Sequence, residues 1–203
     1  MILYEVRPYG LDKLLVFSNA TDTIVAKSII DLAFGINVRV GLDSLLFPGE
    51  LPLSSLEKIL ANHTGSVSNQ FGKSHIIEVD YAEGLDTQLL SEITGLAQSD
   101  LIKLHRGTEW VVALIGFAPG FPYLRPKNNE EFWDRVPRLP SPRVKVPIGS
   151  VGLAAGMSCI YPVEMPGGWH VIGKTNTQMF NKKTSNSPSL LSVGDTVVFK
   201  ESH

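Results

Sequence analysis

Proline and glycine are concentrated in one stretch of the chain. Nine of the thirteen prolines and nine of the eighteen glycines lie in the 69 residues from Gly107 to Thr175. Proline lacks the amide hydrogen that helices and central strands need, and glycine weakens both, so long helices are excluded here. Short apolar runs in and after this stretch predict strands joined by shaped loops. These runs predict a closed or nearly closed β-barrel from the strands Trp110–Ile115, Val144–Val146, Val151–Ala154, Trp169–Ile172 and Thr196–Phe199.

The first eighty residues carry a different pattern. Apolar residues spaced by three and four, after possible capping residues at 19–22, predict a helix that ends at Gly35. Ser54 and Glu57 fit a capping box that would open a second helix, running to about Asn62. Short apolar runs predict strands at 2–8, 13–18, 36–42, 44–47 and 75–79. The order β-β-α-β-β-α-β predicts a small two-layer α/β domain over residues 1–80.

Two helices are expected after this domain. Asp86 and Ser99 are the expected N-caps, and Gly107 is the expected end of the second helix. We place the domain boundary near Tyr81, which gives an α+β protein whose β-barrel domain spans 81–203. The polar runs 64–73 and 181–189 predict exposed loops.

The bulk composition excludes several classes of protein. The net charge of −2 disfavours binding to a nucleic acid backbone. Cys159 is the single cysteine, so an internal disulfide is impossible and a reducing compartment is expected. The first residues do not resemble a signal peptide, and no apolar run approaches the roughly 20 residues of a membrane span. We therefore expect a soluble cytoplasmic protein with neither a nucleic acid nor a membrane as partner.

A glycine- and proline-containing loop carries the first candidate site. Residues 116–124 follow a predicted strand and present three aromatic side chains on a stiff backbone. Such a loop can wall a pocket or anchor a partner, which makes candidates of Phe117, Pro119, Gly120 and Phe121. The equal alternative is a corner of the fold filled by its own aromatic rings.

A second candidate combines cations with prolines. Residues 137–147 place Arg138, Arg143 and Lys145 on a segment that holds four prolines. An arginine held in place suits recognition of a carboxylate or phosphate. The alternatives are solvated surface charge and, for Arg143, a structural brace to an acidic residue such as Glu164.

The third candidate is the segment 166–170. Gly167 and Gly168 can let backbone amides approach a ligand, beside Trp169 and His170. The alternative is a hairpin turn with a core tryptophan and a structural histidine. Residues 168–175 also match the phosphate-binding P-loop pattern, but their interior is bulky and no helix is predicted to follow, so we reject that match.

Other chemistry is weakly represented. A triad of Ser150, His170 and Asp195 can be drawn, but any chain of this size offers such triples, and Asp195 is better interpreted as a turn residue. The sequence predicts no metal site, and no catalytic residue is assigned.

Five linked motifs resemble a known family. In order between about Leu104 and Phe199, they are GFAPGFPYL, PRLPSPRVKVPIGSVGLAAG, IYP, PGGWHVIGKT and PSLLSVGDTVVF. Together they closely resemble the family of 5-oxoprolinase B subunits, of the allophanate hydrolase subunit 1 and carboxyltransferase-domain type. The fold that this implies is a small α+β domain followed by a cyclophilin-like β-barrel.

The resemblance also implies a function. It implies one component of a hydrolase for the ATP-dependent opening of 5-oxo-L-proline to L-glutamate, together with a tightly bound C subunit and with the A subunit of 5-oxoprolinase. Such a chain would be inactive alone, and its ATP site is not assigned to this chain. Relatives include a sporulation inhibitor that binds a sensor histidine kinase, and urea- and allophanate-processing enzymes, so both roles remain alternatives.

The site that follows joins the three candidate segments. We expect a barrel pocket in which Arg143 binds a carboxylate or phosphate, bordered by the aromatic loop and by residues 166–170. Two positions depart from the family pattern: Met157 stands where Gln is usual, and Tyr81 is followed by Ala-Glu-Gly instead of Gly-Gly. Met157 loses an amide that can donate and accept, which points to an altered substrate or to a chain that only binds.

Overall fold

The computed structural model describes residues 2–61, 72–184 and 187–202. The chain forms two compact units, Met1–Phe71 and Gly72–His203. The sequence predicts a boundary near Tyr81, whereas the units divide after Phe71. The difference arises because β5 (Ser74–Val79) pairs in parallel with β13 (Thr196–Glu201) over all six of its residues. The loop expected at 64–73 lies outside the described residues apart from its last two.

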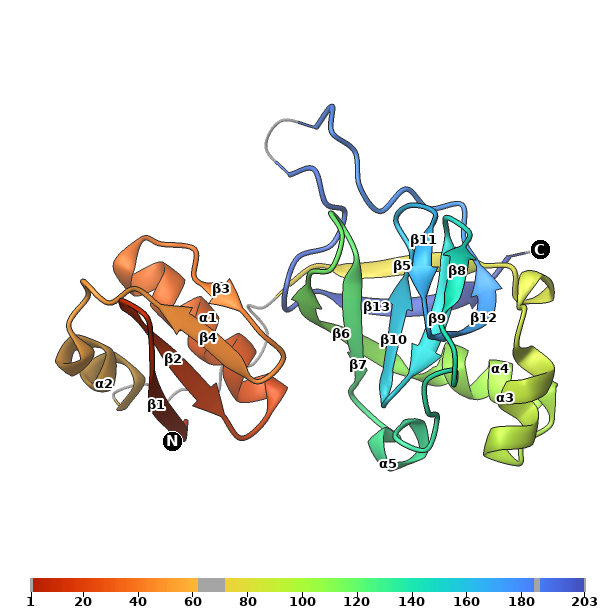
Figure 1. Ribbon diagram of the computed structural model, residues 1–203, viewed down its shortest axis with the longest axis horizontal. Helices are drawn as coiled ribbons and strands as arrows, with labels where there is room; N and C mark the ends of the chain where they lie inside the picture. The colour runs from red at the N-terminus through yellow and green to blue at the C-terminus, as the bar shows by residue number, and fades with distance from the viewer. Residues whose placement is uncertain (1, 62–71, 185–186, 203) are drawn as a thin grey trace. The chain divides into compact units, whose positions relative to one another are not determined.

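The first unit packs two helices against one sheet (Figure 1). The antiparallel sheet has the strand order β1-β2-β4-β3. Its core holds Leu15, Ile30, Leu45 and Phe47, all fully buried. The element order matches the expectation from the sequence except for the last strand, β5, which belongs to the second unit. The bounds are β1 (Tyr4–Tyr9), β2 (Asp12–Phe17), α1 (Ala20–Phe34), β3 (Arg39–Val40), β4 (Ser44–Phe47) and α2 (Leu53–Ala61).

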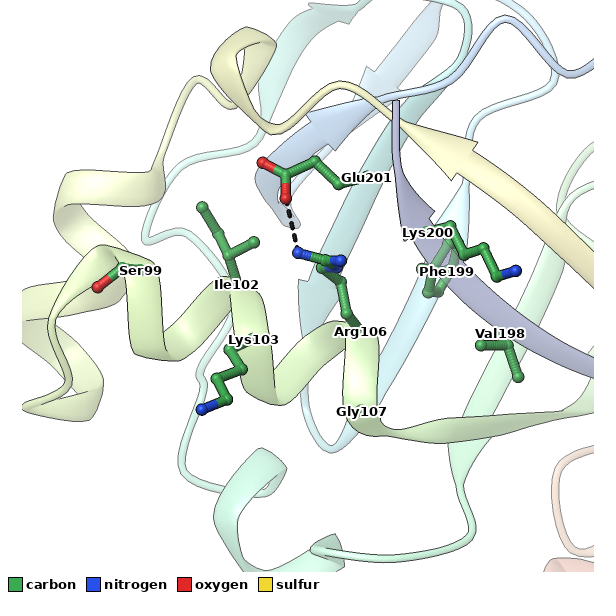
Figure 2. Close-up of a pocket in the computed structure, with 9 residues that line it drawn as sticks. All are labelled: Ser99, Ile102, Lys103, Arg106, Gly107, Val198, Phe199, Lys200 and Glu201. Atoms are coloured by element: carbon green, nitrogen blue, oxygen red, sulfur yellow. Dashed lines mark hydrogen bonds and ion pairs between the residues drawn. The ribbon is translucent and has the colours of Figure 1, made fainter. Parts of the chain in front are cut away.

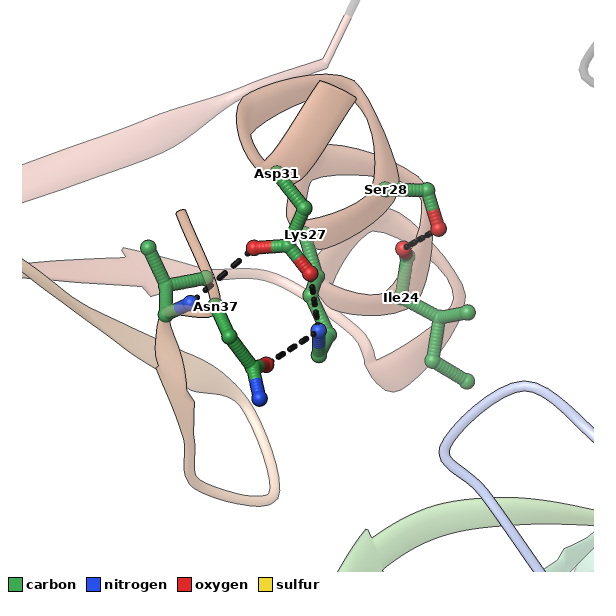
Figure 3. Close-up of polar contacts among 6 residues, drawn as sticks. Ile24, Lys27, Ser28, Asp31 and Asn37 are labelled. Atoms are coloured by element: carbon green, nitrogen blue, oxygen red, sulfur yellow. Dashed lines mark hydrogen bonds and ion pairs between the residues drawn. The ribbon is translucent and has the colours of Figure 1, made fainter. Parts of the chain in front are cut away.

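Local side-chain chemistry sets the ends of α1. The Asn19 side chain accepts a hydrogen bond from the amide of Asp22 at 2.8 Å, and Gly35 ends the helix in the left-handed conformation, as predicted. Lys27 forms an ion pair with Asp31 and donates to Asn37 Oδ1 at 3.1 Å, which ties the helix to the segment before β3 (Figure 3).

The predicted start of α2 is wrong. The helix begins at Leu53, and the amides of Ser55 and Leu56 both donate to the carbonyl of Pro52. Ser54 therefore lies inside the first turn and is not its N-cap.

The second unit is built on one long, curled sheet (Figure 1). Its seven strands have the order β12-β9-β10-β7-β6-β13-β5, and β8 pairs separately with β11. Helix α3 contacts β12 and α4 contacts β13. The further bounds are η1 (Tyr81–Glu83), α3 (Thr87–Thr94), α4 (Gln98–Gly107), β6 (Glu109–Ile115), β7 (Pro122–Pro126), α5 (Glu130–Trp133), β8 (Arg143–Val146), β9 (Ser150–Ala154), β10 (Met157–Ile160), β11 (Met165–Gly167) and β12 (His170–Lys174).

The two edges of the curled sheet meet at one point. Asp80, directly after β5, exchanges two backbone hydrogen bonds with Lys174 at the end of β12, at 2.8 and 2.9 Å. We call this contact the seam. An open sheet would leave both edge strands unpaired. The seam joins them, as the closed or nearly closed barrel predicted from the sequence requires. The finer classification as a cyclophilin-like barrel stays a prediction.

A buried histidine lies at the centre of the second unit. His105, on α4, is fully buried and stacks on Phe199, with ring centroids 4.6 Å apart. Its Nδ1 lies 2.8 Å from the hydroxyl of Tyr81, and its Nε2 lies 3.4 Å from Ser158 Oγ. Burial lowers the pKa of His105 to about 3. The imidazole is therefore neutral at physiological pH and acts as part of the core.

One of the two expected helix starts in the second unit is confirmed, and the other is wrong. α4 starts after Ala97, so Ser99 lies within its first turn instead of capping it. Asp86 does precede α3, but its side chain makes no capping hydrogen bond. Among the described helices, none is long and apolar enough to cross a membrane.

Candidate functional site

The aromatic loop between β6 and β7 is a tight, strained turn. The amide of Ala118 donates to the carbonyl of Gly116 at 2.8 Å, which closes a γ-turn around Phe117 with φ of 69°. A bulky residue rarely adopts a positive φ, and such strain persists only where surrounding contacts enforce it. Here Gly116 donates to the carbonyl of Phe121, and Phe121 donates to Ala118. The turn presents the Phe117 ring to solvent, 68% exposed.

Phe121, in contrast, is part of the core. It is 2% exposed, and its ring packs against four other aromatic rings. The ring centroids lie 5.1–6.5 Å away and belong to Phe117, Tyr123, Tyr161 and Trp169. The loop thus combines both expectations, because Phe121 fills the corner and Phe117 is free to meet a partner. Pro119 is exposed, and Gly120 adopts a positive φ where the chain at Met179 and Phe180 passes close by.

The segment 166–170 joins this aromatic cluster. Trp169 is buried in it, and a Cβ on Gly167 would lie 2.2 Å from the Tyr161 hydroxyl. The close approach that Gly167 permits is therefore to a tyrosine of this chain. A Cβ on Gly168 would lie 3.6 Å from its nearest neighbour, Pro142 Cγ, which is an ordinary contact. The Gly168 carbonyl accepts a hydrogen bond from the Leu139 amide at 2.8 Å.

Arg143 is held in place, as the sequence predicts, but by an unforeseen acid. Its Nη2 lies 2.5 Å from Asp86 Oδ1, and its Nη1 lies 3.5 Å from the carbonyl of Trp169. The second oxygen of Asp86 accepts a hydrogen bond from the amide of Val171 at 2.7 Å. Asp86 therefore links the start of α3, strand β12 and strand β8. The acid suggested by the sequence, Glu164, pairs with Lys145 instead, at 3.1 Å.

His170 lies next to this ion pair and is buried. Neither ring nitrogen makes a hydrogen bond of ordinary geometry with the described residues. Burial lowers the pKa of His170, an effect that the Asp86 carboxylate and the Pro137 carbonyl partly oppose. A neutral imidazole beside a guanidinium, with the Pro137 carbonyl as its nearest acceptor, is suited to contact a polar ligand group.

The structure does not assemble the triad that the sequence allows. On adjacent strands, Ser150 pairs with Lys174, whereas His170 pairs with Leu153, three positions farther along. Asp195 accepts hydrogen bonds from the amides of Lys73 and Ser192 and contacts His75 Nε2 at 3.0 Å. Asp195 thus stabilises the turn before β13, as expected for a turn residue.

We expect the Asp86–Arg143 pair to stabilise the fold measurably. Asp86→Ala removes the bond to Val171 and leaves the guanidinium without its acid, so a loss of about 2–3 kcal/mol is predicted. Arg143→Lys keeps the charge but loses the second guanidinium nitrogen as a donor, so we expect the free energy of unfolding to fall by about 1 kcal/mol. Urea unfolding measures both changes. Lys145→Ala, in an exposed pair, is the control and should change stability by less than about 0.5 kcal/mol. An Asp86 variant as stable as this control would contradict the bracing role.

Comparison with known proteins identifies the family. The family profile described as carboxyltransferase domain, subdomain C and D, matches residues 6–191. The Escherichia coli O157:H7 protein named as the B subunit of 5-oxoprolinase is 31% identical over 183 residues, which cover 86% of this chain and 82% of that protein. This chain belongs to the 5-oxoprolinase B-subunit family.

Other relatives are longer than this chain or align with it only in part. The B subunit of 5-oxoprolinase from Bacillus subtilis (strain 168) is 40% identical over 116 residues, 57% of this chain and about half (47%) of that protein. Among solved structures, TTHA0988 matches with a TM-score of 0.74 and 26% identity. The match covers all of this chain and 40% of the TTHA0988 chain, so this fold also occurs as one part of a longer protein.

Met157, the departure from the family pattern, lies away from the candidate site. It is buried at the start of β10 and lines a cavity of 120 Å³ with Arg125, Glu130 and Asp134. Phe121 and Trp169 do not line this cavity. The altered substrate expected from Met157 stays a prediction.

Larger cavities also lie outside the predicted site. A groove of 770 Å³ is lined by α4 and β13, and an Arg106–Glu201 ion pair at 2.6 Å joins the two elements there (Figure 2). Two more cavities, of 540 and 510 Å³, lie beside α4 and at the seam. None of the nine predicted ligand-binding residues lines any of these four cavities. The ligand-binding roles of those nine therefore stay predictions, although the structure brings Phe121, Arg143, Trp169 and His170 together.

Proposed function

We propose that this chain is the B subunit of an ATP-dependent 5-oxoprolinase that opens 5-oxo-L-proline to L-glutamate together with the A and C subunits. One observation carries the proposal. The chain aligns over most of its length with a protein named as the B subunit of 5-oxoprolinase, at 31% identity and 86% coverage. Because such a component acts within an assembly, the single chain is expected to be inactive. We also propose that the assembly acts in the cytoplasm.

The geometry of the candidate site supports this substrate class. 5-Oxoproline carries a carboxylate on a small flat lactam ring, so it needs a cation and an apolar wall. Arg143 has a half-buried guanidinium with further N–H donors besides those facing Asp86 and Trp169. The Trp169 carbonyl lies 3.5 Å from this guanidinium, the Trp169 ring packs with Phe121, and the buried His170 follows Trp169 in the chain. We propose that this cluster contacts the substrate.

The P-loop-like residues do not suit ATP. Residues 168–175, which match the P-loop pattern, form strand β12 and its flanks, and no helix follows them among the described residues up to 202. A P-loop needs a loop that opens a helix, so these residues do not fit nucleotide phosphates in that way. We propose that ATP acts with the assembled complex, at a site that is not assigned to this chain.

Phe117 is the proposed anchor for the C subunit. Phe117→Ala should weaken association with that subunit tenfold or more, because an exposed aromatic ring on a stiff turn is a typical hot spot. Its melting temperature should hardly change. Phe121→Ala is the contrasting variant, and removing this buried ring should destabilise the fold by about 3–5 kcal/mol. Binding to the surface-immobilised C subunit and thermal melting measure the two effects. Unchanged affinity in Phe117→Ala would remove the anchor role.

Co-purification tests the proposed assembly. Tagged chain and untagged C subunit, expressed together, should elute as one complex by size exclusion. Separate elution would contradict the proposal. Capture of a sensor histidine kinase under the same conditions, without the C subunit, would favour the inhibitor role instead.

A further inference from the structure

Three residues of the P-loop-like segment, Gly173, Lys174 and Thr175, have structural roles at the seam that do not involve a nucleotide. A Cβ on Gly173 would lie 2.6 Å from Val79 Cγ1 and 2.9 Å from the carbonyl of Asp80, so a side chain there would push the two strands apart. Gly173 lets β12 approach β5 closely enough for Lys174 to bond Asp80. Lys174 and Thr175 are thus fixed at the end of the seam.

A cavity of 510 Å³ opens beside this seam. Glu78 and Asp80 line it from β5 and its end, the segment Lys174–Thr177 lines it from the end of β12, and Ser202 completes it. Every one of these side chains is polar or charged. The cavity shares no residue with the proposed 5-oxoproline cluster.

The side chains of this cavity have unused binding capacity. Lys174 is half-buried, yet its ammonium forms no ion pair with any residue in the described ranges. Glu78, within those same ranges, also lacks an ion pair. Thr175, which is buried, donates its hydroxyl to Thr177 Oγ1 at 3.0 Å and accepts from the Thr177 amide. This arrangement leaves the Thr177 hydroxyl hydrogen free to donate into the cavity.

We propose that the seam cavity binds a free α-amino acid as its zwitterion. Lys174 and the Thr177 hydroxyl receive the carboxylate, and Glu78 and Asp80 receive the ammonium. A plain anion such as phosphate would be repelled by the two acids. A metal cation would be repelled by Lys174. A ligand that carries both charges satisfies both groups at once.

Calorimetric titration of the intact chain tests this site with two matched probes. L-Glutamate carries a free ammonium, whereas 5-oxo-L-proline has a similar carbon skeleton but a neutral lactam nitrogen. The choice of probes rests on the proposed function, but the titration needs no enzymatic activity. L-Glutamate should bind, and both Lys174→Met and Glu78→Gln should weaken that binding tenfold or more. Binding of 5-oxo-L-proline should be unaffected by either substitution.

The control variant is Lys145→Met, which removes an exposed lysine on β8, a strand of the separate two-stranded sheet that does not line the seam cavity, and should leave glutamate binding unchanged. Thermal melting verifies that each variant is folded. The proposal is overturned if L-glutamate does not bind at millimolar concentration, if both seam variants bind it like wild type, or if inorganic phosphate competes for it equally well. Failure of 5-oxoproline turnover in the assembled enzyme would instead count against the proposed function alone.

Discussion

Lowering the pH from 6.5 to 4 is expected to destabilise the second unit by about 3 kcal/mol through His105 alone. The folded protein holds this imidazole neutral, with a pKa of about 3, whereas the unfolded chain has the ordinary value of 6.5. Between those values the unfolded state binds more protons, so stability falls as the pH falls, by about 1.4 kcal/mol per unit. The stability is fully present above pH 6.5.

His105→Gln separates this effect from other titrating groups. Glutamine loses the ring stacking on Phe199 and should lower stability at pH 7 by about 2–4 kcal/mol. It cannot titrate, so its dependence on pH between 4 and 6 should be flatter than that of wild type. Tryptophan fluorescence during urea unfolding reports on the second unit, which holds Trp110, Trp133 and Trp169. Equal slopes in the two proteins would show that His105 is not held neutral.

Gly173→Ala should open the seam and cost about 2–4 kcal/mol. The added Cβ would lie 2.9 Å from a backbone oxygen of Asp80, which cannot move without lengthening the paired bonds at 2.8 and 2.9 Å. Gly107→Ala is a matched control, since nothing lies within 4 Å of its added Cβ, and it should be neutral or stabilising by up to about 1 kcal/mol. Hydrogen exchange of the Lys174 amide measures the seam directly. Unchanged protection in Gly173→Ala would contradict this role of the glycine.

Local chemistry predicted much of the fold. Strands and helices of the first unit follow periodicity, and Gly35 marks the end of α1 because only a residue tolerant of positive φ suits that position. Strand β7 was not predicted, since it begins and ends with proline and lies among loop-forming residues. The partner of β5 lies more than a hundred residues away in β13, and local patterns do not encode such pairing.

The sequence indicated the segments of the candidate site but not how their side chains pack. The sequence indicated an aromatic loop, but burial decides between Phe117 and Phe121, and burial depends on Tyr161 and Trp169 from other strands. It also indicated a fixed Arg143, but the fixing acid, Asp86, had the pattern of a helix cap. No short-range signal could have assigned that partner, which lies 57 residues away.

Reconstitution of the enzyme tests the central claim most directly. The purified A and C subunits are mixed with ATP and 5-oxo-L-proline, with and without this chain, and formation of L-glutamate is measured. L-Glutamate should form only in the complete mixture, and this chain alone should form none. Equal L-glutamate formation without this chain, or turnover by this chain alone, would contradict its role as the B subunit.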